Sequence, residues 1–385
     1  MTAKECSKLG SGEGVSENAV IKHGVNRGMP VLALGERPTS FFEFWPAWLM
    51  YIPVVVYWLL LSIRYRSFGL PMAVNPNIEL GGMVGESKHA ILGQAGEALA
   101  AHILPYIVIK TAAEPRSVAR DALARAAAEG LSFPLVIKPD LGCRGRGVAL
   151  MENEAELVAY LSKQNQGQLF LLQRLAPYQA EAGVFYIKHP GEEKGRLVSL
   201  ALKYRPTVEG DGSSTLEQLI LRHPRAKKLA GIHLAKNREQ LARIPIEGEE
   251  VPLEFAGSHC RGSIFRNGKE FICPALEQSL DCLLKELPEF NYGRLDIKFK
   301  NIDALMAGKD FYIVEINGAS SEQAHIWDSR TPFAEAMGVL LKQYGDLFAM
   351  GASMREHGHH VPSVGKLVYT WLKELGYFGA NRVGK

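Results

Sequence analysis

Two short segments near the C-terminal end combine polar groups with an alternating apolar pattern. Residues 292–299 read YGRLDIKF, and residues 311–317 read FYIVEIN. Because side chains on a β-strand alternate between its two faces, we expect the polar residues of each segment to share one face. These residues are Arg294, Asp296, Lys298, Glu315 and Asn317. If the two strands pair, the carboxylates and the amide converge as hard oxygen ligands, which suit Mg²⁺ bound to a triphosphate.

The alternative for these segments is a hairpin whose polar face meets water. The intervening residues are strongly apolar, which favours polar groups that face a cleft within a buried sheet. In such a cleft Arg294, two residues before Asp296, is placed to stabilise charge that develops on a transferred phosphoryl group or an oxyanion.

A second segment with phosphate chemistry lies between two predicted strands, at 133–138 and 147–151. The first strand ends at Lys138, and the loop that follows is rich in glycine. Its glycines are Gly142, Gly145 and Gly147. Glycines let backbone N–H groups approach phosphate oxygens, and Lys138 adds a compact cation. A plain surface turn is the alternative; the absence of a following helix excludes a Walker A loop and a dinucleotide fingerprint.

The elements that must position these groups alternate along residues 71–348. The predicted helices are at 117–129, 153–164 and 275–287, and the predicted strands are at 133–138, 147–151, 168–173, 183–188, 196–204, 292–299 and 311–316. Capping boxes are predicted at Asn153 with Glu156 and at Ser214 with Glu217. This alternation is typical of an α/β or α+β enzyme.

Together these motifs resemble the ATP-grasp superfamily. The sequence V-I-K-P with its glycine loop, then G-R-L-D and E-I-N, is similar to D-alanine:D-alanine ligases, and residues 203–220 resemble cyanophycin-synthetase-like enzymes. The likeness covers roughly residues 85–326. It implies an α+β ATP-grasp fold with two lobes that grip ATP. It also implies a carboxylate–amine ligase that forms an amide through an acyl phosphate and releases ADP and phosphate.

The resemblance implies roles for individual residues. The expected ATP-binding residues are Lys88, Lys138, Gly142, Gly145, Gly147, Gln173, Arg174, Ala176 and Glu181. The expected ligands of two Mg²⁺ ions, for which Mn²⁺ can substitute, are Asp296, Glu315 and Asn317, with Arg294 as the catalytic residue. Contacts to the substrate are expected from Lys203, Arg205, His259 and Arg261. A structural hydrogen-bonding role is the alternative for His259 and Arg261.

The chain departs from D-alanine ligases in two places. Their N-terminal substrate domain is replaced here by a tail and an apolar segment, and Ile326 stands where a serine is expected. Gln173 also stands where an acid is commoner. D-alanine is therefore not the expected substrate, and the carboxylate and the amine stay unidentified.

The apolar segment, residues 44–63, contains twenty residues without a charge. As a helix it would extend about 30 Å, the thickness of a bilayer core. Tryptophans and tyrosines in it and the arginines Arg64 and Arg66 after it predict a membrane helix with a cytoplasmic C-terminal part. A helix in the interface or packed on the protein is the alternative, because Pro53 interrupts the run.

The whole chain of 385 residues has a net charge of +3 and five cysteines without a metal-like or disulfide-like spacing. Nucleic-acid binding is not expected, and reduced thiols in the cytosol are the simplest interpretation. The expected organisation is a mobile tail (1–37), a membrane segment (38–70), a region before the ATP-grasp domain (71–115), that domain (116–348) and an extension (349–385). The histidines at 357, 359 and 360 are expected in a solvated loop and not at a metal.

Two other functions fit the same residues. One is an ATP-dependent phosphotransferase for a small molecule or a lipid headgroup. The other is a catalytically silent nucleotide-binding membrane module. For the ligase, a membrane lipid is an expected partner and a lipid-linked substrate is one option, because the membrane segment would hold the site at the cytoplasmic face. If the segment packs on the domain, a cytoplasmic location is expected. The oligomeric state stays open.

Overall fold

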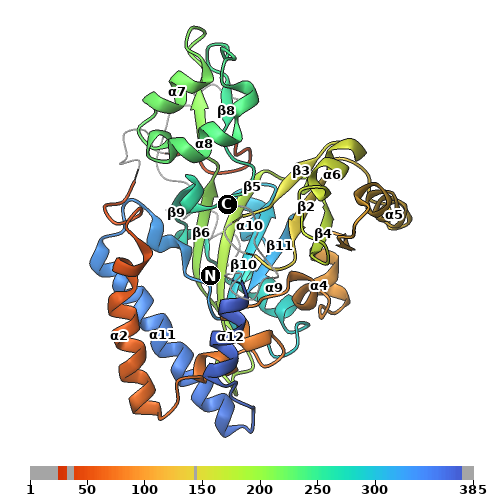
Figure 1. The fold of residues 1–385 in the computed structure, drawn as a ribbon. Helices are drawn as coiled ribbons and strands as arrows, with labels where there is room; N and C mark the ends of the chain where they lie inside the picture. Colours follow the sequence, from red (N-terminus) through yellow and green to blue (C-terminus); the bar gives the residue numbers. More distant parts are fainter. Residues whose placement is uncertain (1–24, 33–38, 143–144, 375–385) are drawn as a thin grey trace.

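The computed structural model describes residues 25–32, 39–142 and 145–374 of the chain (Figure 1). These residues form a mixed α/β structure with a four-stranded, a five-stranded and a two-stranded sheet, and neighbouring strands pair antiparallel. The predicted helices and strands all occur, with ends that differ by up to three residues. The 3-10 helices are η1 (Leu70–Ala73), η2 (Glu79–Gly82), η3 (Ala226–Leu229), η4 (Arg238–Gln240), η5 (His259–Arg261), η6 (Lys269–Phe271) and η7 (Ala324–Trp327).

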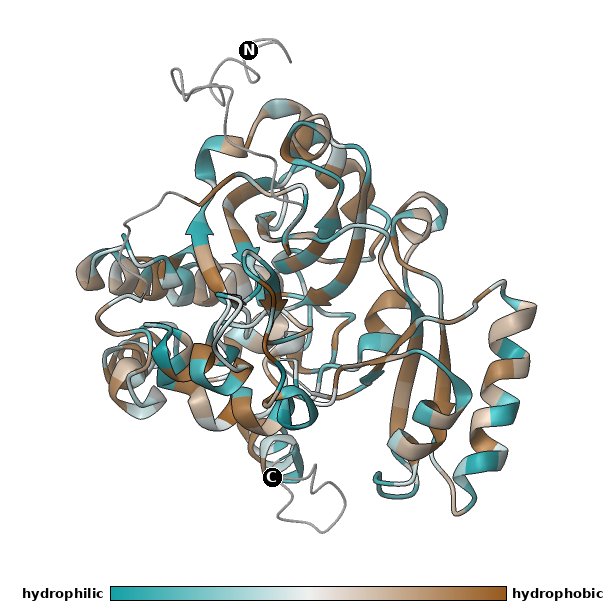
Figure 2. Cartoon of the chain, turned by 90° about the horizontal axis from the view of Figure 1, so that it is seen from above, coloured by the Kyte–Doolittle hydropathy of each residue, from teal (hydrophilic) through white to brown (hydrophobic). Residues whose placement is uncertain are grey.

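The four-stranded sheet has the order β1-β4-β2-β3. Its strands are β1 (Tyr106–Lys110), β2 (Leu135–Pro139), β3 (Ala149–Met151) and β4 (Leu169–Arg174). The helices α5 (Pro115–Ala128) and α6 (Glu154–Leu161) share one apolar core with it. Helix α5 begins with proline and buries Ala119, Ala122 and Ala126, whose helical spacing gives it one apolar face. In Figure 2 the strands of this sheet, on the right, are largely apolar.

The five-stranded sheet has the order β11-β10-β5-β6-β9. Its strands are β5 (Ala180–Ile187), β6 (Arg196–Tyr204), β9 (Ile264–Asn267), β10 (Tyr292–Phe299) and β11 (Phe311–Asn317). One apolar core joins it to α3 (Lys88–Leu92), α4 (Glu97–His102), α9 (Pro274–Leu284) and α10 (Ile302–Met306). A second contacts α11 (Phe333–Glu356) through Phe185, Tyr292 and Leu347. The central strand β5 is buried at every residue, because both its edges and both its faces are covered.

A small unit follows β6 and lies at the top of Figure 1. It contains β7 (Thr207–Glu209), α7 (Leu216–Arg222), α8 (Ala230–Lys236) and β8 (Glu250–Pro252). The predicted capping box in it was wrong by one residue, because the box is formed by Thr215 and Gln218. Ser214 is instead bound to the carboxylate of Asp211, to which it donates hydrogen bonds from its backbone N and its hydroxyl at 2.6 Å each. Ser214 is therefore bonded within the loop, and Thr215 caps the helix.

The apolar segment forms one helix, α2 (Ala47–Tyr65), which continues through Pro53. Over Trp48–Tyr65 it is the only described helix that is long and apolar enough to cross a membrane, and 22% of that window is buried in the protein. Figure 1 shows α2 running beside α11. The ring of Trp58 packs edge-on against Tyr344 and Phe348 of α11, with centroids 5.5 and 5.2 Å away.

Part of the predicted mobile tail is docked on the body, which corrects that expectation for residues 25–32. The backbone N–H of Arg205 donates to Asn26 Oδ1 at 2.7 Å, and Tyr204 donates its hydroxyl hydrogen to the carbonyl of Pro30 at 2.9 Å. Met29 and Leu32 pack on the large core. The tail from 1 to 24 and from 33 to 37 lies outside the described residues.

The C-terminal extension also contacts the body. Helix α12 (Val364–Glu374) places Glu374 Oε1 2.8 Å from the backbone N of Gly85, from which it accepts a hydrogen bond. Of the predicted solvated histidines, His359 lies 3.4 Å from Glu289, and His357 is bonded to the carbonyl of Ser353 at 2.7 Å. Through Glu374, helix α12 thus contacts the segment that precedes Lys88.

Candidate active site

Strands β10 and β11 bring the two polar segments together. They pair antiparallel with Asp296 opposite Glu315 and Arg294 opposite Asn317. On the other side of β10, Asp296 lies opposite Gly183 of β5. A Cβ atom at Gly183 would lie 3.1 to 3.3 Å from the side chains of Arg294, Asp296 and Lys203. The glycine therefore leaves the space in which these charged groups meet.

A β-bulge interrupts the pairing next to this point. Ile297 pairs with Ile313 and Asp296 with Glu315, so Val314 is an extra residue without a partner on β10. Its carbonyl accepts a hydrogen bond from Lys138 Nζ at 2.8 Å. Since Lys138 belongs to β2, this bond joins the four-stranded sheet to the five-stranded sheet. Burial lowers the pKa of Lys138 to about 8, although Glu315 opposes the shift.

Lys88 brings a second cation to the same edge. Ser87 caps α3 by accepting from the backbone N of Ala90, and Lys88 is the first residue of that helix. Its ammonium lies 3.3 Å from Glu315 Oε1 and donates to the carbonyl of Gly142 at 2.6 Å. The residue thus ties the glycine loop to β11, so Lys88 and Lys138 both lie where the two sheets meet.

A network of alternating charges surrounds Asp296. Its Oδ1 atom lies 2.9 Å from Arg294 Nε and 2.8 Å from Lys203 Nζ. Lys203 also lies 3.4 Å from Glu181, which pairs with Lys298 at 2.6 Å. Burial raises the pKa of Asp296, but Arg294 and Lys203 outweigh burial and hold this pKa at about 2. Burial likewise opposes ionisation of Glu181, but Lys298 and Lys203 together lower its pKa.

The donor set suits a hard divalent cation. Asp296 and Glu315 offer carboxylate oxygens and Asn317 an amide oxygen, which are the ligand types that Mg²⁺ takes. The Nδ2 atom of Asn317 is buried and has no hydrogen-bond partner among the described residues. Among the residues that the structure describes, no group of three or more His, Cys, Asp or Glu side chains is arranged to hold a metal ion. Both carboxylates are paired with lysine or arginine, Glu315 with Lys88 and Asp296 with Lys203 and Arg294.

The glycine loop curves as predicted, with φ of 146° at Gly142, 69° at Gly145 and 70° at Gly147. These left-handed conformations favour glycine, because a side chain would be strained there. A Cβ at Gly145 would lie 3.0 Å from Ala256 and 4.0 Å from Arg261. The loop therefore approaches the segment that precedes β9, and its residues Cys143 and Arg144 lie outside the described residues.

Three of the residues expected to bind ATP, which by the resemblance would contact the adenine base, lie at the end of β4 or just after it. Gln173 is buried, and its amide donates to the carbonyl of Leu104 at 2.9 Å. Arg174 is exposed and donates to the carbonyl of Gly130 at 3.1 Å. Ala176 is half-buried. Both long side chains are engaged by backbone carbonyls of their own lobe, which leaves the backbone of this segment as the group for a base to contact.

The four expected substrate contacts separate into two groups. Lys203 belongs to the charge network, and Arg205 lies with its guanidinium 5.6 Å from the centre of the Phe255 ring. Arg205 Nε is buried without a partner among the described residues, and burial lowers the pKa of Arg205. His259 stacks on Trp327 with ring centroids 4.3 Å apart, and Arg261 lies 3.5 Å from Glu254.

Two acidic residues that the sequence did not single out lie at the site. Glu86 Oε1 accepts a hydrogen bond from the backbone N of Gly318, directly after Asn317. Burial, joined by the charge of Glu315, raises the pKa of Glu86 to about 7. Burial also raises the pKa of Glu322 to about 7, and the backbone carbonyl of this residue accepts from Arg294 at 3.3 Å. The available signal for Glu86 was its position two residues before Lys88.

Ile326, which stands where the resemblance leads us to expect a serine, lies in the core. Ile326 is fully buried in η7 and packs in an apolar cluster with Phe42 and Met50. The preceding His325 is buried as well, and its Nδ1 lies 2.7 Å from the hydroxyl of Ser199. This turn is thus part of the core under α2 and presents neither side chain to a ligand.

Comparisons with known proteins give weak similarities. No protein-family model matches the chain, and no curated protein matches it significantly. Among solved structures the chain is similar to a bifunctional glutathione synthetase from Pasteurella multocida, with 15% identity and a TM-score of 0.34 over 66% of this chain and 36% of that chain. It is also similar to the VanG D-Ala:D-Ser ligase from Enterococcus faecalis, with 12% identity and a TM-score of 0.38 over 71% of this chain and 62% of that chain. D-cycloserine synthetase DcsG shares 12% identity, with a TM-score of 0.34 over 69% of this chain and 70% of that chain. Similarity at this level assigns no activity, so the functional argument rests on the residues of the site.

Proposed function

We propose that the chain is an ATP-grasp carboxylate–amine ligase. The observation that carries the proposal is the convergence of groups from both sheets at one edge. Asp296 and Glu315 lie opposite each other on β10 and β11, and the ammonium of Lys88 lies 3.3 Å from Glu315. Lys138 reaches the same edge from β2 through the bulge at Val314. Carboxylates for a metal beside cations for phosphates are the requirements of a site that binds a nucleoside triphosphate.

The proposed reaction has two steps. A substrate carboxylate oxygen attacks the γ-phosphorus of ATP, the bond from this phosphorus to the ADP oxygen breaks, and an acyl phosphate forms. An amine then attacks the acyl carbon, loses a proton, and phosphate leaves as the amide forms. Asp296, Glu315 and Asn317 would hold two Mg²⁺ ions, or Mn²⁺ in their place. The metal would neutralise phosphate charge.

The chain's own residues supply the rest. Lys88 and Lys138 would bind phosphate oxygens, and they already lie at the boundary between the sheets. Arg294, half-buried beside Asp296, would stabilise the charge that develops during transfer. When ATP and the metal bind, Lys203 and Arg294 would be released from Asp296.

We further propose that the enzyme works at the cytoplasmic face of a membrane on a lipid-linked carboxylate or amine. The exposed apolar side chains of α2 support this, since Trp48, Val55 and Ile63 are 69%, 56% and 73% exposed. A large exposed apolar patch on a soluble protein marks an interaction site.

The test of the ligase proposal uses the full chain with ATP, Mg²⁺, hydroxylamine and a metabolite and lipid extract. We expect hydroxamates, detected by mass spectrometry, together with ADP. Asp296→Asn and Glu315→Gln should lower both products by about 10³-fold, because each removes a metal ligand. Asp310→Asn is the matched control, since Asp310 is an exposed carboxylate paired with Lys300 at 3.4 Å.

Other outcomes identify the alternatives. A phosphorylated product and ADP without hydroxamate would indicate a phosphotransferase. Binding of a non-hydrolysable ATP analogue without any ADP formation would indicate a silent nucleotide-binding module. Full activity in Asp296→Asn would contradict the assignment of the metal site.

A further inference from the structure

We infer that α2 is an in-plane membrane anchor that docks on an anionic lipid surface and does not cross the bilayer. The inference makes the membrane association proposed above specific, and it does not depend on the ligase reaction.

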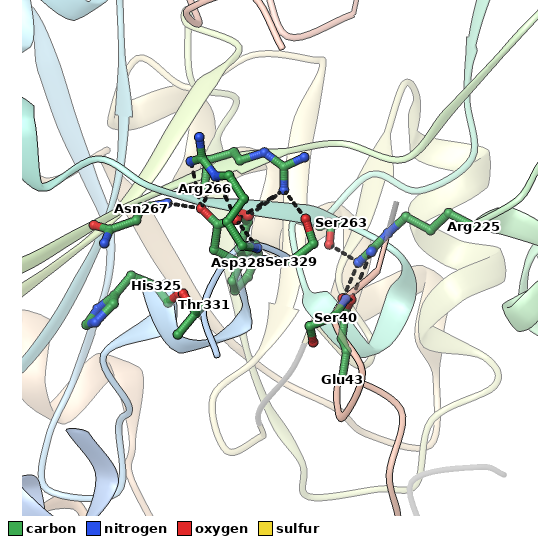
Figure 3. Close-up of polar contacts among 12 residues, drawn as sticks. Ser40, Glu43, Arg225, Ser263, Arg266, Asn267, His325, Asp328, Ser329 and Thr331 are labelled. Carbon is green, nitrogen blue, oxygen red and sulfur yellow. Dashed lines mark hydrogen bonds and ion pairs between the residues drawn. The ribbon is translucent and has the colours of Figure 1, made fainter. Parts of the chain in front are cut away.

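Both ends of α2 are fixed to the same body. Before the helix, Glu43 is buried and pairs with Arg225 (Figure 3), and Thr39 accepts a hydrogen bond from Lys228 at 2.8 Å. After the helix, Leu70 is fully buried, and its carbonyl lies so close to α11 that a Cβ at Gly351 would approach it to 2.1 Å. Nineteen helical residues extend about 28 Å. A spanning helix would need its ends on opposite sides of the bilayer, so this fold is incompatible with spanning.

One face of α2 is already occupied by protein. Met50, Val54 and Leu61 are 2%, 3% and 7% exposed, and they pack in clusters that include residues of α11. Lifting the helix off the body would expose these side chains and those of α11 beneath them. The helix is therefore part of the fold as well as a candidate anchor.

The opposite face is a continuous apolar stripe, which we call the α2 stripe. It consists of Trp48, Leu49, Ile52, Val55, Val56, Leu59, Leu60 and Ile63, which are 39% to 73% exposed. Their spacing of three and four residues places them along one side of a helix. Phe41 and Phe68, beyond the two ends, are 79% and 50% exposed. An apolar stripe with aromatic groups at its ends fits the boundary between headgroups and acyl chains.

Charge decides between a lipid surface and other coverings. From residue 44 to residue 78 the sequence has no acidic residue, and Glu43 is buried in its pair with Arg225. Arg64 and Arg66 are exposed at the C-terminal end of the stripe. The segment that forms α2 thus carries cations and no acid, which favours anionic headgroups, whereas a protein interface commonly has a rim of mixed polar groups.

A hollow beside the stripe supports the same occupant. It has a volume of about 350 Å³ and is lined by Tyr57, Leu60, Leu61, Arg64, Tyr65 and Gly345. The hollow offers a guanidinium and two phenol groups next to aliphatic side chains. This combination suits a phosphate headgroup above the start of an acyl chain.

The test uses flotation of the purified full chain with vesicles, without ATP. Vesicles of phosphatidylcholine alone are compared with vesicles that contain about 30% phosphatidylglycerol. We expect binding that is stronger to the anionic vesicles. The double variant Ile52→Asn/Leu60→Asn should lower the partition coefficient at least about tenfold, because two apolar contacts with lipid are lost. Leu221→Asn/Ile246→Asn, at positions 48% and 72% exposed elsewhere, should bind like the wild type.

The charge and the topology have their own readouts. Arg64→Gln/Arg66→Gln should remove the preference for anionic vesicles, whereas Arg116→Gln/Arg120→Gln on the exposed face of α5 should keep it. Val31→Cys, at a position 96% exposed, should react with a membrane-impermeant maleimide on vesicles as readily as the exposed Cys282 does.

Three results would overturn the inference. The first is the absence of flotation together with a dimer in sedimentation that the variant Ile52→Asn/Leu60→Asn dissociates. A second copy of the chain would then cover the stripe. The second is flotation that this variant does not change. The third is protection of Val31→Cys until detergent is added while Cys282 reacts, which would show a spanning helix. Loss of ligase activity alone bears on the proposed reaction and leaves this inference intact.

Discussion

Lys203 is the residue whose replacement tests the charge network most sharply. In the absence of nucleotide its ammonium occupies the space next to a predicted metal ligand, 2.8 Å from Asp296 Oδ1 and 3.4 Å from Glu181 Oε1, with only 3% of the side chain exposed. At an effective dielectric constant of about 20, one such contact is worth about 5 kcal/mol before desolvation is subtracted. Lys203→Met keeps most of the volume and removes this charge.

We expect opposite effects of Lys203→Met on metal and on nucleotide. Without nucleotide, Mn²⁺ should bind about ten- to a hundredfold more tightly, because 1.4 kcal/mol of lost competition corresponds to about a factor of ten. ATP should bind more weakly, since one cation for the phosphates is gone. The free energy of unfolding should fall by about 3 kcal/mol, because two buried carboxylates lose a shared partner.

The assay is Mn²⁺ titration followed by electron paramagnetic resonance, with thermal unfolding on the same samples. Lys298→Met is the matched control, since Lys298 pairs with Glu181 at 2.6 Å and belongs to the same network. It should destabilise the protein without tightening Mn²⁺ binding at Asp296. Equal Mn²⁺ affinity in the wild type and both variants would refute the idea that Lys203 competes with the metal.

Three further substitutions have defined outcomes. Burial raises the pKa of Glu86 from 4.5 to about 7, so this residue binds a proton more tightly in the folded state and stability is lost as pH rises through this window. Glu86→Gln should remove about 3 kcal/mol of that loss, measured by urea unfolding at about pH 4 and pH 8. Gly338→Ala in α11, where a Cβ meets nothing within 4 Å, should stabilise the protein by about 0.5–1 kcal/mol, whereas Gly351→Ala in the same helix should destabilise it in the same thermal scan. Glu43→Gln removes the carboxylate that pairs with the buried Arg225 and should cost about 3 kcal/mol in urea unfolding; a change within 0.5 kcal/mol would contradict the importance of this pair.

Local patterns predicted the elements well. The strands at 292–299 and 196–204 have the predicted ends. In the first, the alternation of the sequence matches the structure, because Leu295, Ile297 and Phe299 are fully buried and the polar residues between them are partly buried. The capping box at 214–217 was misplaced, because the competing carboxylate of Asp211 binds Ser214. A local rule fails where a neighbouring side chain takes the same hydrogen bonds.

Long-range partners could not be predicted in the same way. The ammonium of Lys203 reaches Asp296 because β5 lies between β6 and β10 and has a glycine at the crossing point. Nothing in the residues near Lys203 specifies that order of strands. The same holds for Glu86, whose carboxylate lies at the site because it accepts a hydrogen bond from Gly318, directly after β11. The residue types of the site were readable from the sequence, but most of their contacts depend on topology.

The docking of α2 changes how the chain can be shortened. A truncation that removes the apolar segment would also remove Met50, Val54 and Leu61 from the clusters on α11. Such a protein would lose core as well as any anchor, so loss of its activity would say nothing about membranes. The surface substitutions on the α2 stripe separate the two effects.

Because of the bulge at Val314, the bond between Lys138 and β11 depends on one extra residue in this strand. Replacing the valine side chain leaves its carbonyl available to Lys138, because that bond uses only the backbone. Deleting the residue would remove this carbonyl and restore a regular ladder, in which residues 311–313 keep their faces because Ile313 and Glu315 already lie on opposite faces. Lys138, a buried cation, would lose its acceptor. In a set of related sequences, a one-residue gap at this position would therefore signal a different coupling between the two lobes, even where every charged residue of the site is retained.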